Sequence, residues 1–241
     1  MEIIRGLKID CGYISPSFVN STKGLNKCVL HDAFVLLSIN KISSIKDLMP
    51  ALELVKDKQL LIIAQDVDSE ALSTLVLNRI KNKMKICAVK APEYGSANQF
   101  RILKDIATAT GATLFGAEEF PESSLENIQM SDFGKVGEAQ ITHDSLLLIE
   151  GKGSKEKIEK RLKQIENEIE SISLTSHSSE SISSAELERE RLKARFAKLT
   201  NGVAIIKVGG ITELHVSEKI DTIVDALNAT KCALAEGKLI C

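Results

Sequence analysis

The chain has 241 residues, of which 44% are apolar and 27% are charged, and its formal net charge is −2. That length suffices for one substantial hydrophobic core and a smaller second unit. The charge contains no long block of one sign, which argues against a nucleic-acid partner and against a membrane surface. The longest apolar runs fall far short of the roughly 20 residues that cross a bilayer. We therefore expect no nucleic-acid partner and no membrane partner.

The N-terminal residues resemble neither a secretory signal nor a transit peptide, so any targeting segment is expected outside this chain. Five cysteines are scattered without a CxxC pair, and the four histidines show no metal-ligand spacing. We expect reduced thiols without chemistry, and no metal site.

Between residues 30 and 139 short apolar runs alternate with helical patterns. Strands are predicted at 33–37, 60–64, 85–90 and 113–115. Helices are predicted at 48–55 with Pro50 near the first turn, at 70–81 with Asp68 or Ser69 as cap, and at 97–110 ended by Gly111. This alternation predicts an α/β fold, with a sheet core flanked by helices.

After Gly153 the pattern becomes that of a helical hairpin. A charged helix is predicted at 155–172 and a second at 185–199, packed antiparallel. The Ser-rich residues 171–184 between them predict a mobile loop. The chain then predicts a strand at 202–208, a turn at 209–210, a strand-like stretch at 213–216, and a helix at 219–236 that acts as a connector. The apolar stripe of the first hairpin helix comprises Ile158, Leu162, Ile165 and Ile169.

The helix that follows Asp68 is apolar over an unusually wide arc. At about 100° per residue its apolar positions cover roughly 240°, whereas docking on one core needs little more than 100°. Two interpretations stay open: burial on two sides by neighbouring elements, or an exposed apolar patch that binds a partner. The helix near Pro50 is similar, and two such helices side by side would form a groove. The apolar positions of the wide arc are Ala71, Leu72, Leu75, Val76, Leu77 and Ile80.

A different class of function is suggested by the Gly-rich turn at 150–155, which follows an apolar strand and precedes a helix. That order is typical of a phosphate cradle, but the spacing fits neither GxxxxGK[ST] nor GxGxxG, and a plain hinge also explains the glycines. Asp66 and Asp68 are explained by capping, and no Ser/His/Asp set stands out. The alternative function is a small-molecule or phosphate-binding α/β enzyme domain.

Seven longer strings stand in order along the chain: Gly12-Tyr13-Ile14-Ser15-Pro16, Lys41-Ile42-Ser43, Leu61-Ile62-Ile63-Ala64, Glu70-Ala71-Leu72, Val89-Lys90-Ala91-Pro92, Asp105-Ile106-Ala107-Thr108 and Gly202-Val203-Ala204-Ile205-Ile206-Lys207-Val208-Gly209. The same strings occur in this order in one protein family, the group I chaperonins, which the chain resembles from about residue 3 to residue 237. The resemblance implies a chaperonin apical-domain fold of the swivelling β/β/α type, with a helical hairpin and a connector. It divides the chain into an intermediate-domain strand at 1–4, an apical domain at 5–203 and an intermediate-domain segment at 204–241. The equatorial domain and its Gly-Asp-Gly-Thr signature are absent from these residues.

The same resemblance implies roles for individual residues. Asp225 corresponds to the carboxylate that helps to position the attacking water during ATP hydrolysis in the full-length ring. Glu213 corresponds to an acidic intersubunit contact, although Cys11 stands where the family commonly has the arginine partner. Ser17 stands where the family has an aromatic residue. The implied polypeptide-binding positions are Tyr13, Ser17, Phe18, Met49, Leu52, Leu72, Val76 and Leu77.

The implied function is that of the substrate- and co-chaperonin-binding domain of an ATP-dependent chaperone, which grips unfolded polypeptides through an apolar groove. The fragment itself is expected to be no enzyme and to hold no cofactor, whereas the full-length parent would be an ATPase that uses ATP and Mg²⁺. The implied partners are unfolded polypeptides, a co-chaperonin and the other subunits of a homo-oligomeric ring. The implied location is the mitochondrial matrix or another organelle, or alternatively a bacterial cytoplasm.

Overall fold

A computed structural model describes residues 2–4, 6–20, 26–56, 58–93, 96–117, 125–175, 179–200, 203–206 and 208–236. The chain forms two compact units, one of residues 4–203 and one of residues 1–3 with 204–241. The assignment of each unit to a domain of a chaperonin subunit stays a prediction.

The larger unit is built on a mixed sheet in the order β2-β8-β7-β3-β4-β5, with β6 beside the end of β3. The long strand β3 pairs in parallel with β4 and β6 and antiparallel with β7. The fold is therefore α/β, as predicted, and its sheet is mixed. The strands are β2 (Gly6–Ile9), β3 (Cys28–Ser38), β4 (Leu60–Ala64), β5 (Ile86–Lys90), β6 (Leu114–Phe115), β7 (Gly134–Ile141) and β8 (Leu146–Gly151).

The segment after β2 connects the turn between β7 and β8 with the edge strand β5. Tyr13 donates its backbone N–H to the carbonyl of Thr142, just after β7, at 3.1 Å. It also forms a bridge with Val89 of β5. Gly12 makes this crossing possible, because a Cβ there would lie 1.6 Å from the carbonyl oxygen of His143.

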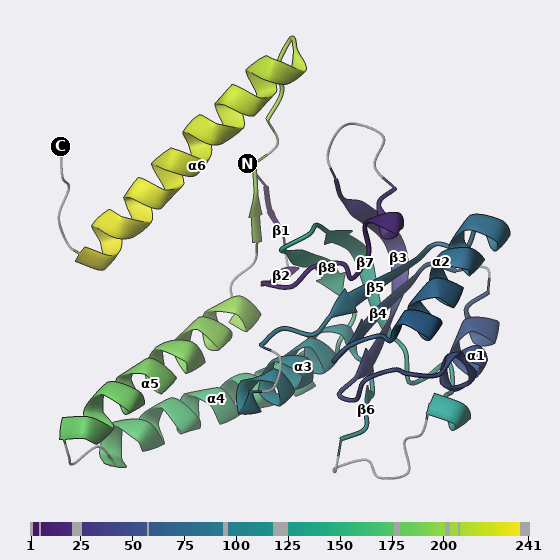
Figure 1. Cartoon of the computed structure of the whole chain (residues 1–241). Coiled ribbons are helices and arrows are strands. Elements are labelled where there is room, and N and C mark those ends of the chain that lie inside the picture. The colour runs from purple at the N-terminus through teal and green to yellow at the C-terminus, as the bar shows by residue number, and fades with distance from the viewer. Residues whose placement is uncertain are drawn as a thin grey trace. The chain divides into compact units, whose positions relative to one another are not determined.

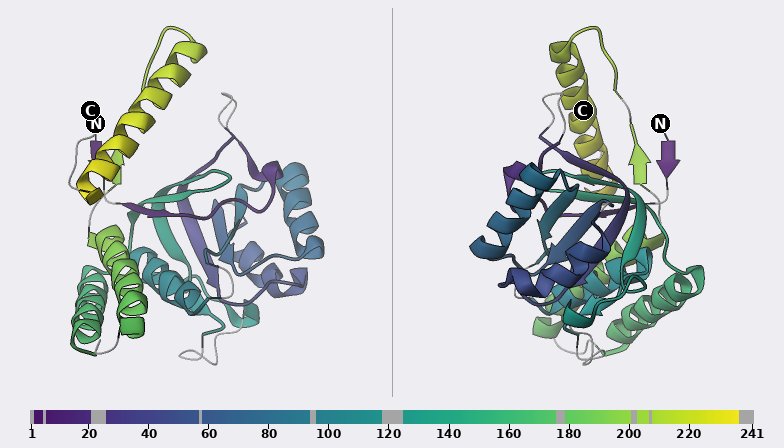
Figure 2. Two further views of the ribbon diagram at one scale, coloured as in Figure 1. Left: turned by 60° about the vertical axis from the view of Figure 1, so that its left-hand side comes forward. Right: turned by 90° about the vertical axis from the view of Figure 1, so that its right-hand side faces the viewer.

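Helices cover both faces of the sheet. Figures 1 and 2 show α1 (Ile45–Leu54) and α2 (Ser69–Asn82) on one side, and α3 (Ala97–Thr110) with the hairpin of α4 and α5 on the other. Short 3-10 helices lie at η1 (Pro16–Phe18) and η2 (Leu125–Asn127). Strand β4 is buried at all five positions, and the core extends from it to both helix layers.

Local sequence signals set several of these boundaries as predicted. Strand β4 and helix α3 have the predicted bounds, and Gly111 ends α3 in the left-handed conformation at φ +79°. The predicted position of Pro50 is wrong. Ser44 caps α1 by accepting the Lys46 N–H, so the helix begins at Ile45 and Pro50 lies in its interior.

The hairpin consists of α4 (Lys155–Thr175) and α5 (Ser179–Thr200), which pack against each other and against α3. The predicted apolar stripe faces inward, since Ile165 is buried and its three companions are half-buried. The predicted loop over residues 171–184 is wrong for 171–175 and 179–184, which are helical, and 176–178 lie outside the described residues. Extending an existing helix costs far less free energy than nucleating one. The modest helix propensity of the Ser-rich residues therefore does not end α4 at residue 171.

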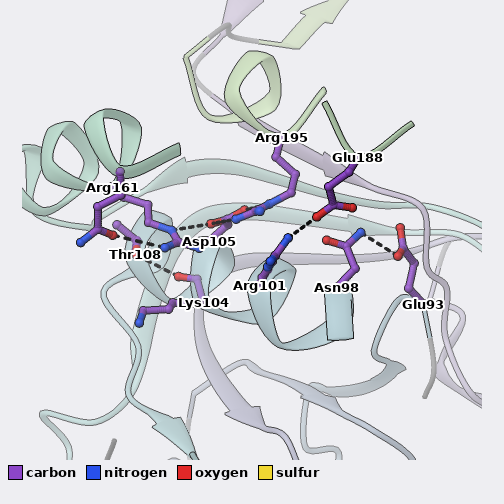
Figure 3. Close-up of polar contacts among 10 residues, drawn as sticks. Glu93, Asn98, Arg101, Lys104, Asp105, Thr108, Arg161, Glu188 and Arg195 are labelled. Carbon is purple, nitrogen blue, oxygen red and sulfur yellow. Dashed lines mark hydrogen bonds and ion pairs between the residues drawn. The ribbon is translucent and has the colours of Figure 1, made fainter. Parts of the chain in front are cut away.

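A buried ion network attaches this hairpin to α3 (Figure 3). Asp105 of α3 accepts a hydrogen bond from Arg161 Nε of α4 at 2.9 Å. It also accepts two from Arg195 of α5, at 2.7 Å from Nε and 3.0 Å from Nη2. All three side chains are more than nine-tenths buried. Nearer solvent, Arg101 of α3 pairs with Glu188 of α5. One carboxylate therefore joins three helices.

The smaller unit contains helix α6 (Glu213–Glu236), while β1 (Glu2–Ile4) and β9 (Val203–Ile205) form a two-stranded sheet at the boundary. The strand predicted at 213–216 is wrong, because these residues form the first turn of α6. Thr212 begins that turn: its Oγ1 accepts the His215 N–H and its carbonyl accepts the Val216 N–H. None of the helices in the described parts of the chain is both long and apolar enough to cross a bilayer.

Candidate functional site

Helices α1 and α2 are in contact with each other and place large apolar side chains in solvent. On α1, Met49 is 45% exposed and Leu54 is 41% exposed. On α2, Leu77 is 48% exposed and Ile80 is 68% exposed. We call these four residues the α1–α2 apolar surface. Exposed apolar residues gathered on two adjacent helices are typical of a binding surface, whereas scattered single ones are ordinary.

The opposite side of the same helices packs on the sheet. Ala71 and Leu75 of α2 are fully buried, while Leu72 and Val76 are half-buried and pack against the core. The wide apolar arc of α2 is therefore divided: one part belongs to the core, a flank is shared, and the remainder faces solvent. Of the two interpretations left open by the sequence, burial on two sides does not describe Leu77 and Ile80.

The segment before β3 contributes less exposed apolar area than the sequence predicted. Ser17 is exposed, and Tyr13 is half-buried with its ring edge-on to His143 at 6.1 Å. Phe18 is fully buried, with the Arg79 guanidinium 5.9 Å from its ring centroid. The expectation that Phe18 offers its ring to a partner is wrong for this structure, because the 3-10 turn η1 directs the ring into the core.

Leu52 is a second correction, since it is only 5% exposed and belongs to the core. Because α1 begins at Ile45, Leu48, Ala51 and Leu52 share one face, at the i, i+3, i+4 spacing, and that face meets the sheet. Leu54 and Ile80 were missing from the predicted site residues, yet both lie on the exposed surface. The wide arc of α2 was the signal for Ile80.

Arg79 fixes the position of η1 relative to α2. Its Nη1 donates to the carbonyls of Phe18 at 2.6 Å and Ile86 at 3.1 Å, and its Nη2 donates to the carbonyl of Val19 at 2.9 Å. Charge-assisted hydrogen bonds of this kind are stronger than neutral ones. The exposed residues at the start of η1 are therefore held beside α2.

The first turn of α2 bears a local charge pair. Lys41 contacts the Asp68 carboxylate and, as the largest cause, lowers the pKa of that carboxyl below its ordinary value, with a second contribution from Ser43. Asp68 is the N-cap residue but makes no capping hydrogen bond through its side chain. The ion pair with Lys41 explains the presence of Asp68, and no catalytic role is needed to explain it.

The two predicted site residues of the smaller unit lie on α6. Asp225 is exposed in the middle of the helix, and Glu213 is its first residue. The side chain of Glu213 lies outside the described residues. The roles of both residues stay predictions.

The Gly-rich turn between β8 and α4 does not present a phosphate cradle. The backbone N–H of Lys152 bonds the Lys135 carbonyl, and that of Gly153 bonds the Ala109 carbonyl, each at 3.0 Å. A Cβ on Gly153 would lie 2.1 Å from the carbonyl oxygen of Thr108. The glycines therefore allow close packing on the end of α3, and the amides of Lys152 and Gly153 are already used.

The described residues contain no group of three His, Cys, Asp or Glu side chains placed to hold a metal ion. The described cysteines, Cys11, Cys28, Cys87 and Cys232, are free thiols. Burial, followed by the nearby charge of Asp10, raises the pKa of Cys11 to about 12, which makes this thiol a poor nucleophile.

The chain, an α/β fold with an exposed apolar helix pair, is related to known proteins by sequence. No family model matches it. It is 46% identical over 239 residues to Heat shock protein 60A of Drosophila melanogaster, covering 98% of this chain and 39% of the fly protein. It is 46% identical over 239 residues to the Chaperonin homolog Hsp-60, mitochondrial, of Caenorhabditis elegans, covering 98% and 40%. Heat shock protein 60, mitochondrial, of Candida albicans is 43% identical over 241 residues, covering 99% and 40%.

The class of protein that these matches indicate is the molecular chaperones of the heat-shock type. The chain is a homologue of the group I, 60 kDa chaperonins along nearly its entire length, and it spans about two fifths of the length of these relatives.

Proposed function

We propose that the larger unit is the apical, polypeptide-binding domain of an ATP-dependent chaperonin subunit, with the swivelling β/β/α fold of that domain. The observation that supports this most directly is the α1–α2 apolar surface, in a chain homologous to chaperonins. Non-native proteins have exposed apolar side chains in common and little else. A surface of Met, Leu and Ile without directional polar partners suits such clients.

The chemistry of this surface favours weak and unselective binding. Each Å² of apolar surface removed from water contributes about 25 cal/mol. Met49 adds adaptability, because its unbranched thioether side chain adjusts to partners of different shape. A single domain would therefore bind a client weakly, and a ring of domains would hold it through effective concentration. Leu72 and Val76 would join the contact at the half-buried flank.

The remaining assignments follow from the same homology. The smaller unit would be part of the intermediate domain, with Asp225 positioning the attacking water and Glu213 contacting a neighbouring subunit. ATP and Mg²⁺ would bind elsewhere in the full-length protein, so this chain alone is proposed to have no ATPase activity. A co-chaperonin would compete with clients for α1 and α2. A mitochondrial location is proposed because the names of several relatives describe them as mitochondrial.

The test is capture of a denatured protein by the 241-residue chain in the absence of nucleotide. Light scattering would follow the aggregation of a chemically denatured enzyme diluted into buffer. We expect the wild-type chain to slow aggregation, and the double variant Leu77→Glu/Ile80→Glu to lose most of this effect, because a client would then have to desolvate two carboxylates.

The matched control is Leu187→Glu on α5, since Leu187 is 51% exposed, close to the value for Leu77. This variant receives one new carboxylate, against two in the double variant, at an exposure similar to that of Leu77 and on the opposite side of the sheet. It should capture clients as well as the wild type. Equal loss in the control and in the double variant would contradict a specific role of α1 and α2. A wild-type chain without any effect on aggregation would reject the proposed function.

A further inference from the structure

A hollow of about 470 Å³ lies around the ring of Phe34 on β3, where β4 and β7 begin and β8 ends. The basic side chains that line it are His31, Lys58, Lys135 and Lys152. They come from β3, from the turn before β4, from β7 and from the turn after β8, so residues distant in the sequence converge at one place. Neither the sequence patterns nor the proposed chaperone function accounts for this convergence.

The geometry holds the lysines together. Lys58 Nζ lies 4.7 Å and Lys135 Nζ 5.3 Å from the centroid of the Phe34 ring. Because both distances refer to one ring, the two nitrogens are no more than about 10 Å apart. The backbone N–H of Lys152 donates to the carbonyl of Lys135 at 3.0 Å, which fixes the third lysine beside the second.

The floor of the hollow is rigid. The Phe34 ring is 6.0 Å from that of Phe133 in an edge-to-face arrangement at 89°. Gln59 ties the strand down twice: its carbonyl accepts the Phe34 N–H at 2.8 Å, and its side chain accepts the His31 N–H at 2.9 Å. Between these bonds Asp32 adopts φ +48°, an unfavourable backbone conformation for a residue with a Cβ.

The positive charge of the hollow is not neutralised by the described residues. Their ion pairs do not include Lys58, Lys135 or Lys152. Two acids lie close by: Asp32 is exposed at the rim, and Glu138 is 3.9 Å from His31. The ammonium groups of Lys58 and Lys135 at the Phe34 ring repel each other, and Lys152 adds a third positive charge to the same lining. An anion placed between them would replace repulsion by attraction.

We propose that this lysine hollow binds a compact, multiply charged anion of the oligophosphate class. Lysine serves as a point-charge ligand for phosphate, and three of them match an anion with several charged oxygens close together. A volume of about 470 Å³ favours a compact ligand over an extended acidic peptide. None of the four residues of the α1–α2 apolar surface lines this hollow.

The experiment is calorimetric titration of the 241-residue chain with sodium tripolyphosphate at low ionic strength. We expect one site. Lys58→Gln and Lys135→Gln should each weaken binding about 3- to 10-fold, as loss of one exposed charge contact of about 0.6 to 1.4 kcal/mol predicts. The triple variant with Lys152→Gln should weaken it by more than about 30-fold, and added salt should weaken it in the wild type.

The control variant is Lys46→Gln/Lys163→Gln/Lys193→Gln, which removes the same charge from exposed positions outside the hollow. It should bind tripolyphosphate within about twofold of the wild type, and circular dichroism would confirm that all variants are folded. Equal loss in the control would reduce the effect to net charge and overturn the proposal. So would the absence of binding, or tighter binding of hexaglutamate than of tripolyphosphate.

Discussion

Both helix layers of the larger unit pack on the sheet, but they differ on the side that points away from it. Helices α1 and α2 leave Met49, Leu54, Leu77 and Ile80 in solvent, without a covering element among the described residues. Helix α3 is instead covered by α4 and α5, and the centre of that contact is the buried carboxylate of Asp105 between two arginines. One layer exposes apolar surface, and the other buries charge.

The difference shows that exposure and burial are not simple consequences of hydropathy. Burying an ion pair is often no more favourable than packing apolar residues of the same volume, but removing one partner leaves an uncompensated charge and is strongly destabilising. The network therefore fixes how the hairpin docks, rather than adding much stability. The apolar surface contributes little to the fold, and it is available for binding.

The largest expected effect separates the inner from the outer side of α2. Leu75→Glu should destabilise the protein by more than about 5 kcal/mol or prevent folding, since it combines a core cavity with a buried carboxylate. Leu77→Glu should change stability by no more than about 0.5 kcal/mol. Urea unfolding monitored by circular dichroism measures both. Similar losses would mean that α2 has no free face.

The next largest effect is expected in the buried ion network around Asp105. Asp105→Ala should cost about 3 to 5 kcal/mol, because Arg161 and Arg195 would be left buried without their shared partner. The triple variant Asp105→Leu/Arg161→Leu/Arg195→Met removes every charge and should recover most of that loss in urea unfolding. Failure of the triple variant to recover would show that the network stabilises the hairpin outright.

A smaller, graded effect is expected at the half-buried flank of α2. Leu72→Glu and Val76→Glu should each cost about 1 to 3 kcal/mol, between the values for Leu77 and Leu75, because a rotated carboxylate can still reach water. Thermal melts of the four variants should rank in the order of exposure. A melting temperature for Leu72→Glu equal to that of the wild type would place this side chain fully in solvent.

The smallest effect reports on hairpin docking through Cys11, whose pKa of about 12 is set mainly by burial. Iodoacetamide should label it far more slowly than the exposed Cys232 at pH 8, because the thiolate is the nucleophile. Below that pKa the rate should rise about tenfold per pH unit, as the thiolate fraction does. In Asp105→Ala the labelling should accelerate, and mass spectrometry of peptides would follow it. Unchanged labelling would mean that the hairpin stays docked.

The sequence was most informative where a pattern is local. The run 60–64 and the span 97–110 with Gly111 gave β4 and α3 their predicted bounds, because burial of a short strand and a left-handed helix end depend on residues close in the chain. The stripe from Ile158 to Ile169 likewise predicted the inward side of α4. The wide apolar arc predicted for α2 includes Leu75, which is fully buried.

The sequence was least informative where the outcome depends on distant partners. Strands β2 and β7 were not predicted, and both are defined by pairing with β8. Phe18 and Leu52 were expected in the binding surface, yet η1 and the register of α1 turn them inward. Nothing near Asp105 announces its two arginines, which lie 56 and 90 residues further along the chain.

The amino-acid sequence by itself therefore determined the α/β class, the two apolar helices and the chaperonin relationship, because periodicity and similarity are properties of the chain. Only the tertiary structure decided which side of α2 meets water, which charges are buried together at Asp105, and where Lys58, Lys135 and Lys152 converge. Each of these depends on packing and pairing between segments far apart in the chain. Such contacts depend on the arrangement of the whole sheet, and no local sequence pattern predicts that arrangement.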